Sequence, residues 1–195
     1  MIKLNLTLVA LVVVLVCWLV FVLTFFLRKP PVTSDRKRDP SSIFGVVLQG
    51  LSFLLVWAVR RPLLTSFVSF NNAINGVLEI IAVVSAIASI MLVIAAVKTL
   101  GKEWSLTARV VTGHRLATKG PYSFVRHPIY TAMLGMLLAN GIAFSNWPAL
   151  LVAIAVYLVG TLIRIRSEER LLRETFGAEF EAYSQSVPAL LPGLY

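Results

Sequence analysis

The chain has 195 residues, of which 58% are hydrophobic, and its mean hydropathy is +0.85. Soluble domains are about half apolar or less, so an excess gathered into long runs excludes an ordinary soluble globular domain. The net charge of +9 would suit a nucleic-acid-binding protein, but the basic residues lie between apolar runs, which indicates membrane topology and no nucleic-acid partner.

Three apolar runs in the N-terminal half predict transmembrane helices, because a helix needs about 20 apolar residues to cross the hydrocarbon core. We expect them at residues 5–27, 42–59 and 73–97. The first contains the single cysteine, Cys17, so no internal disulfide is possible. The second has one strongly polar residue, Gln49, and the third carries Glu79 near its start, where the carboxylate is expected to reach the interface.

Two shorter apolar runs, at residues 129–144 and 147–163, are separated only by Ser145 and Asn146. The short connection predicts a tight helical hairpin, with Pro148 in the first turn of its second helix. No helix-breaking residue lies between the end of this apolar run and Gly177, so the second helix is expected to continue beyond the membrane and to end at Gly177. The start of the fourth helix and the end of the fifth then meet on one face.

The distribution of basic residues predicts the orientation. Fifteen of the 18 Lys and Arg residues fall on one side of these helices, and only Lys3, Arg60 and Arg61 fall on the other. The positive-inside rule therefore places the N-terminus outside and the C-terminus in the cytosol. We expect one membrane-embedded domain over residues 1–195, with three helices in 1–97 and a catalytic loop, hairpin and tail in 98–195. The basic linker at 28–40 is also expected to contact membrane lipids.

The segment 98–128 is too long and polar for an ordinary connection between helices. Gly120-Pro121 is a turn signal, and Pro128 suits the first turn of the fourth helix. His127 then lies at a helix N-terminus, where backbone N–H groups and the helix dipole favour a carboxylate or phosphate. The alternative is that Arg126 and His127 only anchor the helix at the lipid headgroups.

Arg164 and Glu168 are four residues apart and share one face of the fifth helix. The simplest interpretation is a solvated ion pair worth about 0.3–0.5 kcal/mol. The hairpin, however, brings this pair to the same face as Arg126 and His127, which favours a polar site at the boundary between water and lipid.

Two motifs in the C-terminal half resemble the isoprenylcysteine carboxyl methyltransferase family. The first is H-x-L-x-T-x-G-x-Y-x-x-x-R-H-P-x-Y over His114–Tyr130. The second is R-x-x-x-E-E followed by F-G-x-E-F-x-x-Y-x-x-x-V-P, over Arg164–Pro188. The likeness covers about 80 residues in the order and spacing of that family, and the first three helices add little to it.

The apolar runs and the basic residues predict an all-α integral membrane fold of about five transmembrane helices with a cytosolic C-terminal catalytic region. This architecture differs from that of the Rossmann-type methyltransferases. The resemblance implies S-adenosyl-L-methionine as methyl donor, S-adenosyl-L-homocysteine as product, and a prenylated cysteine or similar lipid-tailed carboxylate entering from the bilayer. It places the acceptor carboxylate on Arg164 as the catalytic contact and requires no metal ion. Carried over by position, the cofactor contacts are His114, Arg115, Leu116, Ala117, Tyr122, His127, Pro128, Ile129, Tyr130 and Glu168.

The residue chemistry agrees with a carboxylate acceptor, which is already ionised at neutral pH and needs no general base. An acceptor amine of a phospholipid is an alternative, with Glu168, Glu169 or His127 as the base, but Arg164 is a poor neighbour for an ammonium. A membrane reductase that uses a nicotinamide cofactor and a membrane protein without enzymatic activity are the remaining alternatives.

Overall fold

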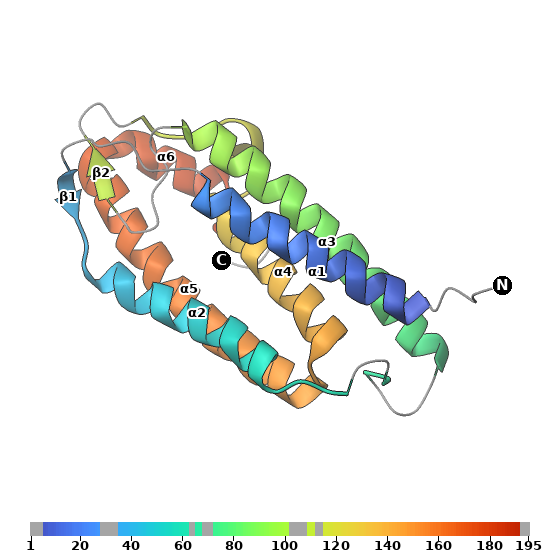
Figure 1. The fold of residues 1–195 in the computed structure, drawn as a ribbon. Helices are drawn as coiled ribbons and strands as arrows, with labels where there is room; N and C mark the ends of the chain where they lie inside the picture. The colour runs from blue at the N-terminus through green and yellow to red at the C-terminus, as the bar shows by residue number, and fades with distance from the viewer. Residues whose placement is uncertain are drawn as a thin grey trace.

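The computed structural model describes residues 6–27, 35–62, 65–67, 72–101, 109–111 and 115–191. Within these ranges the chain is predominantly helical (Figure 1). The α-helices are α1 (Leu6–Phe26), α2 (Ser41–Ala58), α3 (Asn72–Leu100), α4 (Pro128–Phe144), α5 (Trp147–Phe176) and α6 (Ala178–Ser186). A 3₁₀ turn, η2 (Gly120–Ser123), precedes α4.

Four of these helices are long and apolar enough to cross a membrane, over Thr7–Phe26, Ser41–Ala58, Ala73–Leu100 and Trp147–Phe176. Helix α4 has 17 residues, which is about 25 Å at 1.5 Å per residue, slightly less than the hydrocarbon core. Large apolar side chains such as Val16, Leu54 and Met91 are exposed on these helices, as expected for surfaces that face lipid. The five apolar segments and the all-α membrane fold predicted from the sequence are confirmed.

Helix α4 lies at the centre of the bundle and contacts α1, α2, α3 and α5 (Figure 1). Helix α2 runs along α5, and the two approach closely at glycines: a Cβ atom at Gly160 would lie 2.8 Å from the Cβ of Leu48 and 2.9 Å from the carbonyl oxygen of Gly45. Small residues at such crossings allow helix backbones to approach within the membrane. This crossing determines which residues of α2 reach α5.

The hairpin between α4 and α5 is tied to the end of α2. The Ser145 hydroxyl donates to the Val59 carbonyl at 2.7 Å, and the Arg61 guanidinium donates to the carbonyls of Ser145 and Ala143 at 3.0 and 3.1 Å. Arg61 thereby satisfies carbonyls that the C-terminus of α4 leaves without helical partners. The tip of the hairpin therefore lies level with the end of α2, despite the short length of α4.

A short ribbon departs from the purely helical expectation. Strand β1 (Asp35–Arg38) pairs antiparallel with β2 (Arg109–Val111), with Arg38 opposite Arg109 and an irregularity between Asp35 and Lys37. Both strands lie in segments interpreted from the sequence as polar connections. Strands of three and four residues carry too little alternation to be recognised from sequence.

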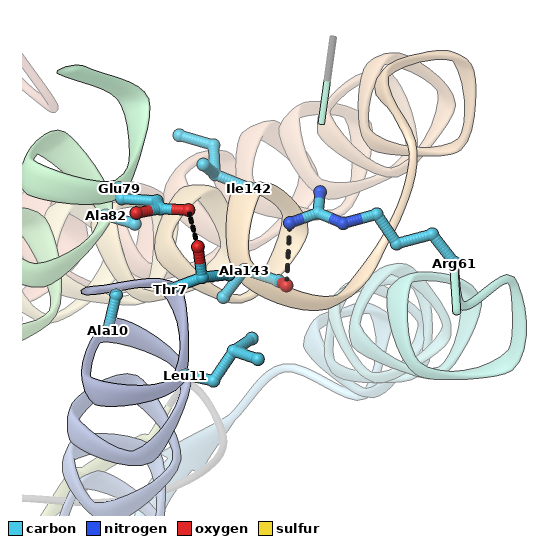
Figure 2. A pocket seen from close by; sticks show the side chains of 8 residues that line it. All are labelled: Thr7, Ala10, Leu11, Arg61, Glu79, Ala82, Ile142 and Ala143. Atoms are coloured by element: carbon cyan, nitrogen blue, oxygen red, sulfur yellow. Dashed lines mark hydrogen bonds between the residues drawn. The ribbon is translucent and has the colours of Figure 1, made fainter. Parts of the chain in front are cut away.

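A small hollow lies at the end of the bundle that holds the hairpin tip (Figure 2). The Glu79 carboxylate accepts a hydrogen bond from the Thr7 hydroxyl at 2.8 Å, and Arg61 approaches from the opposite side. The half-buried Glu79 therefore has a partner within the protein on α1. The lining residues are Thr7, Ala10, Leu11, Arg61, Glu79, Ala82, Ile142 and Ala143.

Candidate active site

The polar side chains predicted to meet do so at the opposite end of α4, around its first turn. His127 precedes the helix with a non-helical backbone (φ −122°, ψ 61°), and Pro128 begins the helix, as the sequence predicts. The preceding turn depends on Gly120, whose φ of +61° is a conformation that favours glycine. This turn directs Arg126 and His127 from η2 into the bundle.

His127 is buried between the two glutamates of α5. Its Nδ1 atom lies 3.5 Å from Glu168 Oε2, and its Nε2 atom lies 3.2 Å from Glu169 Oε1. The imidazole also stacks on the ring of Tyr130, with centroids 5.5 Å apart and planes inclined by 12°. Both ring nitrogens therefore face carboxylates of the protein itself.

Arg164 is 6% exposed and has partners on three helices. Its Nη1 atom donates to Gln49 Oε1 of α2 at 3.0 Å, and its Nη2 atom lies 3.3 Å from Glu168 Oε1. The guanidinium carbon lies 4.8 Å from the ring centroid of Tyr130 on α4, a cation–π arrangement. The Tyr130 hydroxyl donates a short hydrogen bond to the same Glu168 oxygen.

The solvated ion pair considered above for Arg164 and Glu168 is wrong. The side chains of the two residues are 7% and 24% exposed, and both belong to a network with His127 and Tyr130. The side chain of Glu168 is the most exposed of these four residues. A ligand can therefore reach the cluster mainly at the Glu168 carboxylate.

Arg126 joins this cluster to the C-terminal part of the chain. Its Nε atom donates to Glu169 at 2.8 Å, and its Nη1 atom donates to the carbonyls of Ser184, at 2.8 Å, and Val187. Arg126 is therefore more than a headgroup anchor, the alternative left open by the sequence.

The segment 187–190, which we call the C-terminal strap, crosses the first turn of α4. The backbone N–H groups of Arg126 and His127 donate to the carbonyls of Pro188 and Ala189 at 2.8 and 2.9 Å. The Thr131 hydroxyl donates to the Leu190 carbonyl at 2.7 Å. The strap thus occupies the backbone N–H of His127, one of the donors at the N-terminus of α4.

The environment determines the protonation of the groups around the cluster. Burial alone disfavours a charged imidazole, but the hydrogen bonds and charges of Glu168 and Glu169 outweigh it and raise the pKa of His127. Burial raises the pKa of Tyr122, and that of Tyr183 to about 12. Both phenols therefore remain protonated at neutral pH, and Tyr183 donates to the Tyr122 carbonyl at 2.6 Å.

The structure brings His127, Tyr130, Arg164 and Glu168 together from the set proposed on sequence resemblance. Tyr122 and Pro128 are buried beside them, and Ile129 packs with the strap residues Ala189 and Leu190. The other described members precede η2 in irregular backbone, with Arg115 exposed and Leu116 and Ala117 half-buried. His114 lies outside the described residues.

Two residues in contact with the cluster received no specific partner from sequence reasoning. Gln49 lies across from Arg164, and Glu169 binds both Arg126 and His127. The available signal for Gln49 was its position as the single strongly polar residue of an apolar helix, since such residues in membranes usually face a functional partner.

Comparison with known proteins gives matches over the segment that builds this site. Residues 80–174 match the model of the isoprenylcysteine carboxyl methyltransferase family. A nickel–cobalt–cadmium resistance protein of Alcaligenes xylosoxydans xylosoxydans is 35% identical over 100 residues, covering 49% of this chain and 45% of the relative. A probable protein-S-isoprenylcysteine O-methyltransferase of Oryza sativa subsp. indica is 35% identical over 100 residues, which cover 50% of this chain and 52% of the relative.

A third relative is methanethiol S-methyltransferase 1 of Bradyrhizobium diazoefficiens, 37% identical over 87 residues, which cover 45% of this chain and 30% of the relative. The chain spans about half the length, or less, of the curated relatives it matches. The matched residues include α4 and most of α5, and therefore Tyr130, Arg164 and Glu168. On these matches, residues 80–174 of the chain are similar to the isoprenylcysteine carboxyl methyltransferase family.

Proposed function

We propose that this protein is a membrane methyltransferase that uses S-adenosylmethionine to esterify the carboxylate of a prenylated cysteine or a similar lipid-tailed acceptor. The observation that carries the proposal is the buried guanidinium of Arg164, held in an apolar bundle by Gln49 and Glu168. A cation buried among apolar membrane helices is energetically costly and usually marks a functional site. A guanidinium is also the side chain best shaped to bind a carboxylate.

The cluster has the donor and acceptor types that suit S-adenosylmethionine. Glu168 presents a partly exposed carboxylate, which can accept hydrogen bonds from an ammonium or from ribose hydroxyls. The ring of Tyr130 lies against the Arg164 guanidinium and the His127 imidazole, so Tyr130 lines the site beside Glu168. When bound, S-adenosylmethionine supplies a methyl group made electrophilic by the positive sulfur.

His127 acts in this proposal through Glu168. Both of its ring nitrogens face glutamates, so it orients and partly neutralises these carboxylates. Arg164 holds the acceptor carboxylate and shields it from water, and no residue needs to remove a proton because the carboxylate is already ionised. Positioning of the reacting groups then supplies much of the rate.

The deciding experiment supplies purified protein with radiolabelled S-adenosylmethionine and one of three acceptors: an S-farnesylcysteine analogue, phosphatidylethanolamine or methanethiol. The proposal predicts alkali-labile label on the farnesylcysteine analogue, since a methyl ester is cleaved by alkali. The methyl ester of the same analogue, which has no free carboxylate, is the matched control and should remain unlabelled.

Alkali-stable label on the phospholipid would establish the amine acceptor instead, and a labelled volatile thioether would establish a thiol acceptor. Absence of label on every acceptor, from protein that is folded by thermal denaturation, would contradict methyl transfer to all three acceptor classes.

A further inference from the structure

Helix α2 places an amide directly against the Arg164 guanidinium. Gln49 is 1% exposed, and its Oε1 atom accepts from Arg164 Nη1 at 3.0 Å. At its other end, Gln49 Nε2 donates to the Thr161 hydroxyl at 2.9 Å, and Thr161 is fully buried. Gln49 therefore bridges two residues of α5 that lie on the same face of that helix.

The orientation of this amide follows from the chemistry of its partners. A guanidinium has only donors, so the amide oxygen must face Arg164. The amide nitrogen must then face Thr161, whose hydroxyl oxygen can accept. Because both ends of the Gln49 amide are hydrogen-bonded, this residue of α2 fixes the direction in which the Arg164 Nη1–H group points.

The same face of α2 makes room for the Arg164 side chain. Gly45 lies one turn before Gln49, and a Cβ atom there would fall 2.4 Å from Arg164 Cγ and 2.6 Å from the Gly160 carbonyl oxygen. Residues four apart share a helix face. Gly45 therefore accommodates the aliphatic part of Arg164, and Gln49 binds its charged end.

The neutrality of Gln49 matters for an anionic ligand. An amide oxygen holds the guanidinium without cancelling its charge, whereas a carboxylate at the same place would form a second ion pair with Arg164. Glu168 already provides one such carboxylate at 3.3 Å. A second would leave the Arg164 environment net negative and repel an incoming carboxylate.

We propose that Gln49 is a positioning residue that aims the Arg164 guanidinium at the acceptor carboxylate while preserving its positive charge. This inference rests on the proposed function above, because it names the residue that prepares Arg164 for its substrate. It also gives the second helix, which lies outside the matched family segment, a specific part in the site.

Two substitutions test this role. Gln49→Met keeps the side-chain volume but removes the acceptor, and should lower kcat/KM for the farnesylcysteine analogue roughly ten- to a hundred-fold, the loss expected for a hydrogen bond to a charged group. Gln49→Glu keeps an acceptor and adds a charge, and should lower kcat/KM at least as much, mainly through a higher KM. Affinity for S-adenosylhomocysteine, measured by calorimetry, should be unchanged in both.

Ser52→Ala is the matched control. Ser52 is fully buried on α2, one turn from Gln49, and its hydroxyl donates to the Gln49 carbonyl at 2.6 Å without reaching Arg164. It should retain wild-type kcat/KM, which would show that loss of a buried hydroxyl from α2 is not sufficient to impair the reaction. Thermal denaturation of each variant confirms that it is folded.

The outcomes separate the two proposals. Wild-type kcat/KM in folded Gln49→Glu would show that any acceptor suffices, and would reduce Gln49 to a structural partner of a buried arginine. Wild-type kcat/KM in Gln49→Met would contradict the inference equally, and either result leaves methyl transfer by the wild-type protein standing. A wild-type protein that labels no carboxylate contradicts the proposed function itself, and the inference with it.

Discussion

The guanidinium of Arg164 faces two acceptors of different character, the neutral amide of Gln49 and the carboxylate of Glu168. Glu168 in turn receives Tyr130 and His127 as well, so it is the most highly coordinated acidic residue among the described members of the cluster. This asymmetry assigns different roles to the members of one ion pair. We propose that Arg164 serves the acceptor and that Glu168 serves the cofactor.

Substitutions at these positions should therefore have different effects. Arg164→Ala should abolish methyl transfer while affinity for S-adenosylhomocysteine, measured by calorimetry, stays close to that of the wild type. Glu168→Ala should lose both methyl transfer and affinity for S-adenosylhomocysteine. Arg164→Lys should also be poorly active, because an ammonium cannot make the planar two-point contact of a guanidinium with a carboxylate.

The charge-swap variant, Arg164→Glu with Glu168→Arg, is the control for a simple ion pair. It preserves the pair but places negative charge beside the acceptor, so it should be folded and inactive. An active charge-swap protein would show that the two residues only stabilise each other.

His127 makes the stability of the cluster depend on pH. Its surroundings raise its pKa above the value of about 6.5 found in unfolded chains. The stabilisation from the charged imidazole is therefore fully present below about pH 6.5, and it is lost as the pH rises through the higher pKa of the folded protein. The groups that face the ring are Tyr130, Glu168 and Glu169, and Arg126 pairs with the same Glu169.

We expect the melting temperature of His127→Gln to fall furthest below that of the wild type at pH 5.5–6.5, and the gap to narrow towards pH 9. Thermal denaturation of both proteins across this range measures the difference, in which effects of the titratable groups they share largely cancel. A gap that is constant with pH, or that widens at alkaline pH, would show that the imidazole is not charged between the two glutamates.

At the scale of elements, two arginine–glutamate pairs of different burial lie beside the strap and α6. Arg126, which also donates to the carbonyls of Ser184 and Val187, pairs with Glu169 of α5, and Arg173 of α5 pairs with Glu181 of α6. The side chains of Arg126 and Glu169 are each 9% exposed, whereas those of Arg173 and Glu181 are 52% and 50% exposed. Loss of one partner of a buried pair leaves the other charge uncompensated, while exposed pairs are screened by water.

Arg126→Ala should accordingly destabilise the protein by about 3–5 kcal/mol, and Arg173→Ala by about 0–1 kcal/mol. Denaturant unfolding in detergent measures both, and hydrogen exchange should show faster exchange of the His127 amide, which donates to the strap, in Arg126→Ala alone. Equal effects of the two substitutions would argue against the strap as a fixed part of the site.

The elements differ in how well the sequence predicts them. The membrane helices could be predicted because each is a long apolar run, and the meeting of Arg164 with the first turn of α4 followed from the short connection at Ser145 and Asn146. The pairing of Gln49 with Arg164 could not be predicted from the sequence, because it depends on how α2 packs along α5. The position of the strap could not be predicted either, since its backbone hydrogen bonds join residues far apart in the chain and do not depend on the identity of the side chains.

At the scale of the whole molecule, the bundle has two chemically distinct ends. One holds the cluster around Arg164, the strap and α6, and the other holds the hairpin tip with Arg60 and Arg61 (Figure 1). Most basic residues fall at the first end, and we propose on this basis that the site faces the cytosol. A charged water-soluble donor would then reach Glu168 from the cytosol, and a lipid-tailed acceptor would approach Arg164 from the bilayer.

Single cysteines on either side of the bundle test this orientation. Ser66, which follows α2, and Gln185 on α6 are both exposed, so a cysteine at either position is open to reagents on its own side. The buried Cys17 is first replaced by alanine, so that every labelled thiol is an introduced one. In intact cells, a membrane-impermeant thiol reagent should label Ser66→Cys and leave Gln185→Cys unmodified, whereas both should react after the cells are permeabilised. Labelling of Gln185→Cys but not Ser66→Cys in intact cells would reverse the orientation, and would place the Arg164 cluster on the side that cytosolic S-adenosylmethionine does not reach.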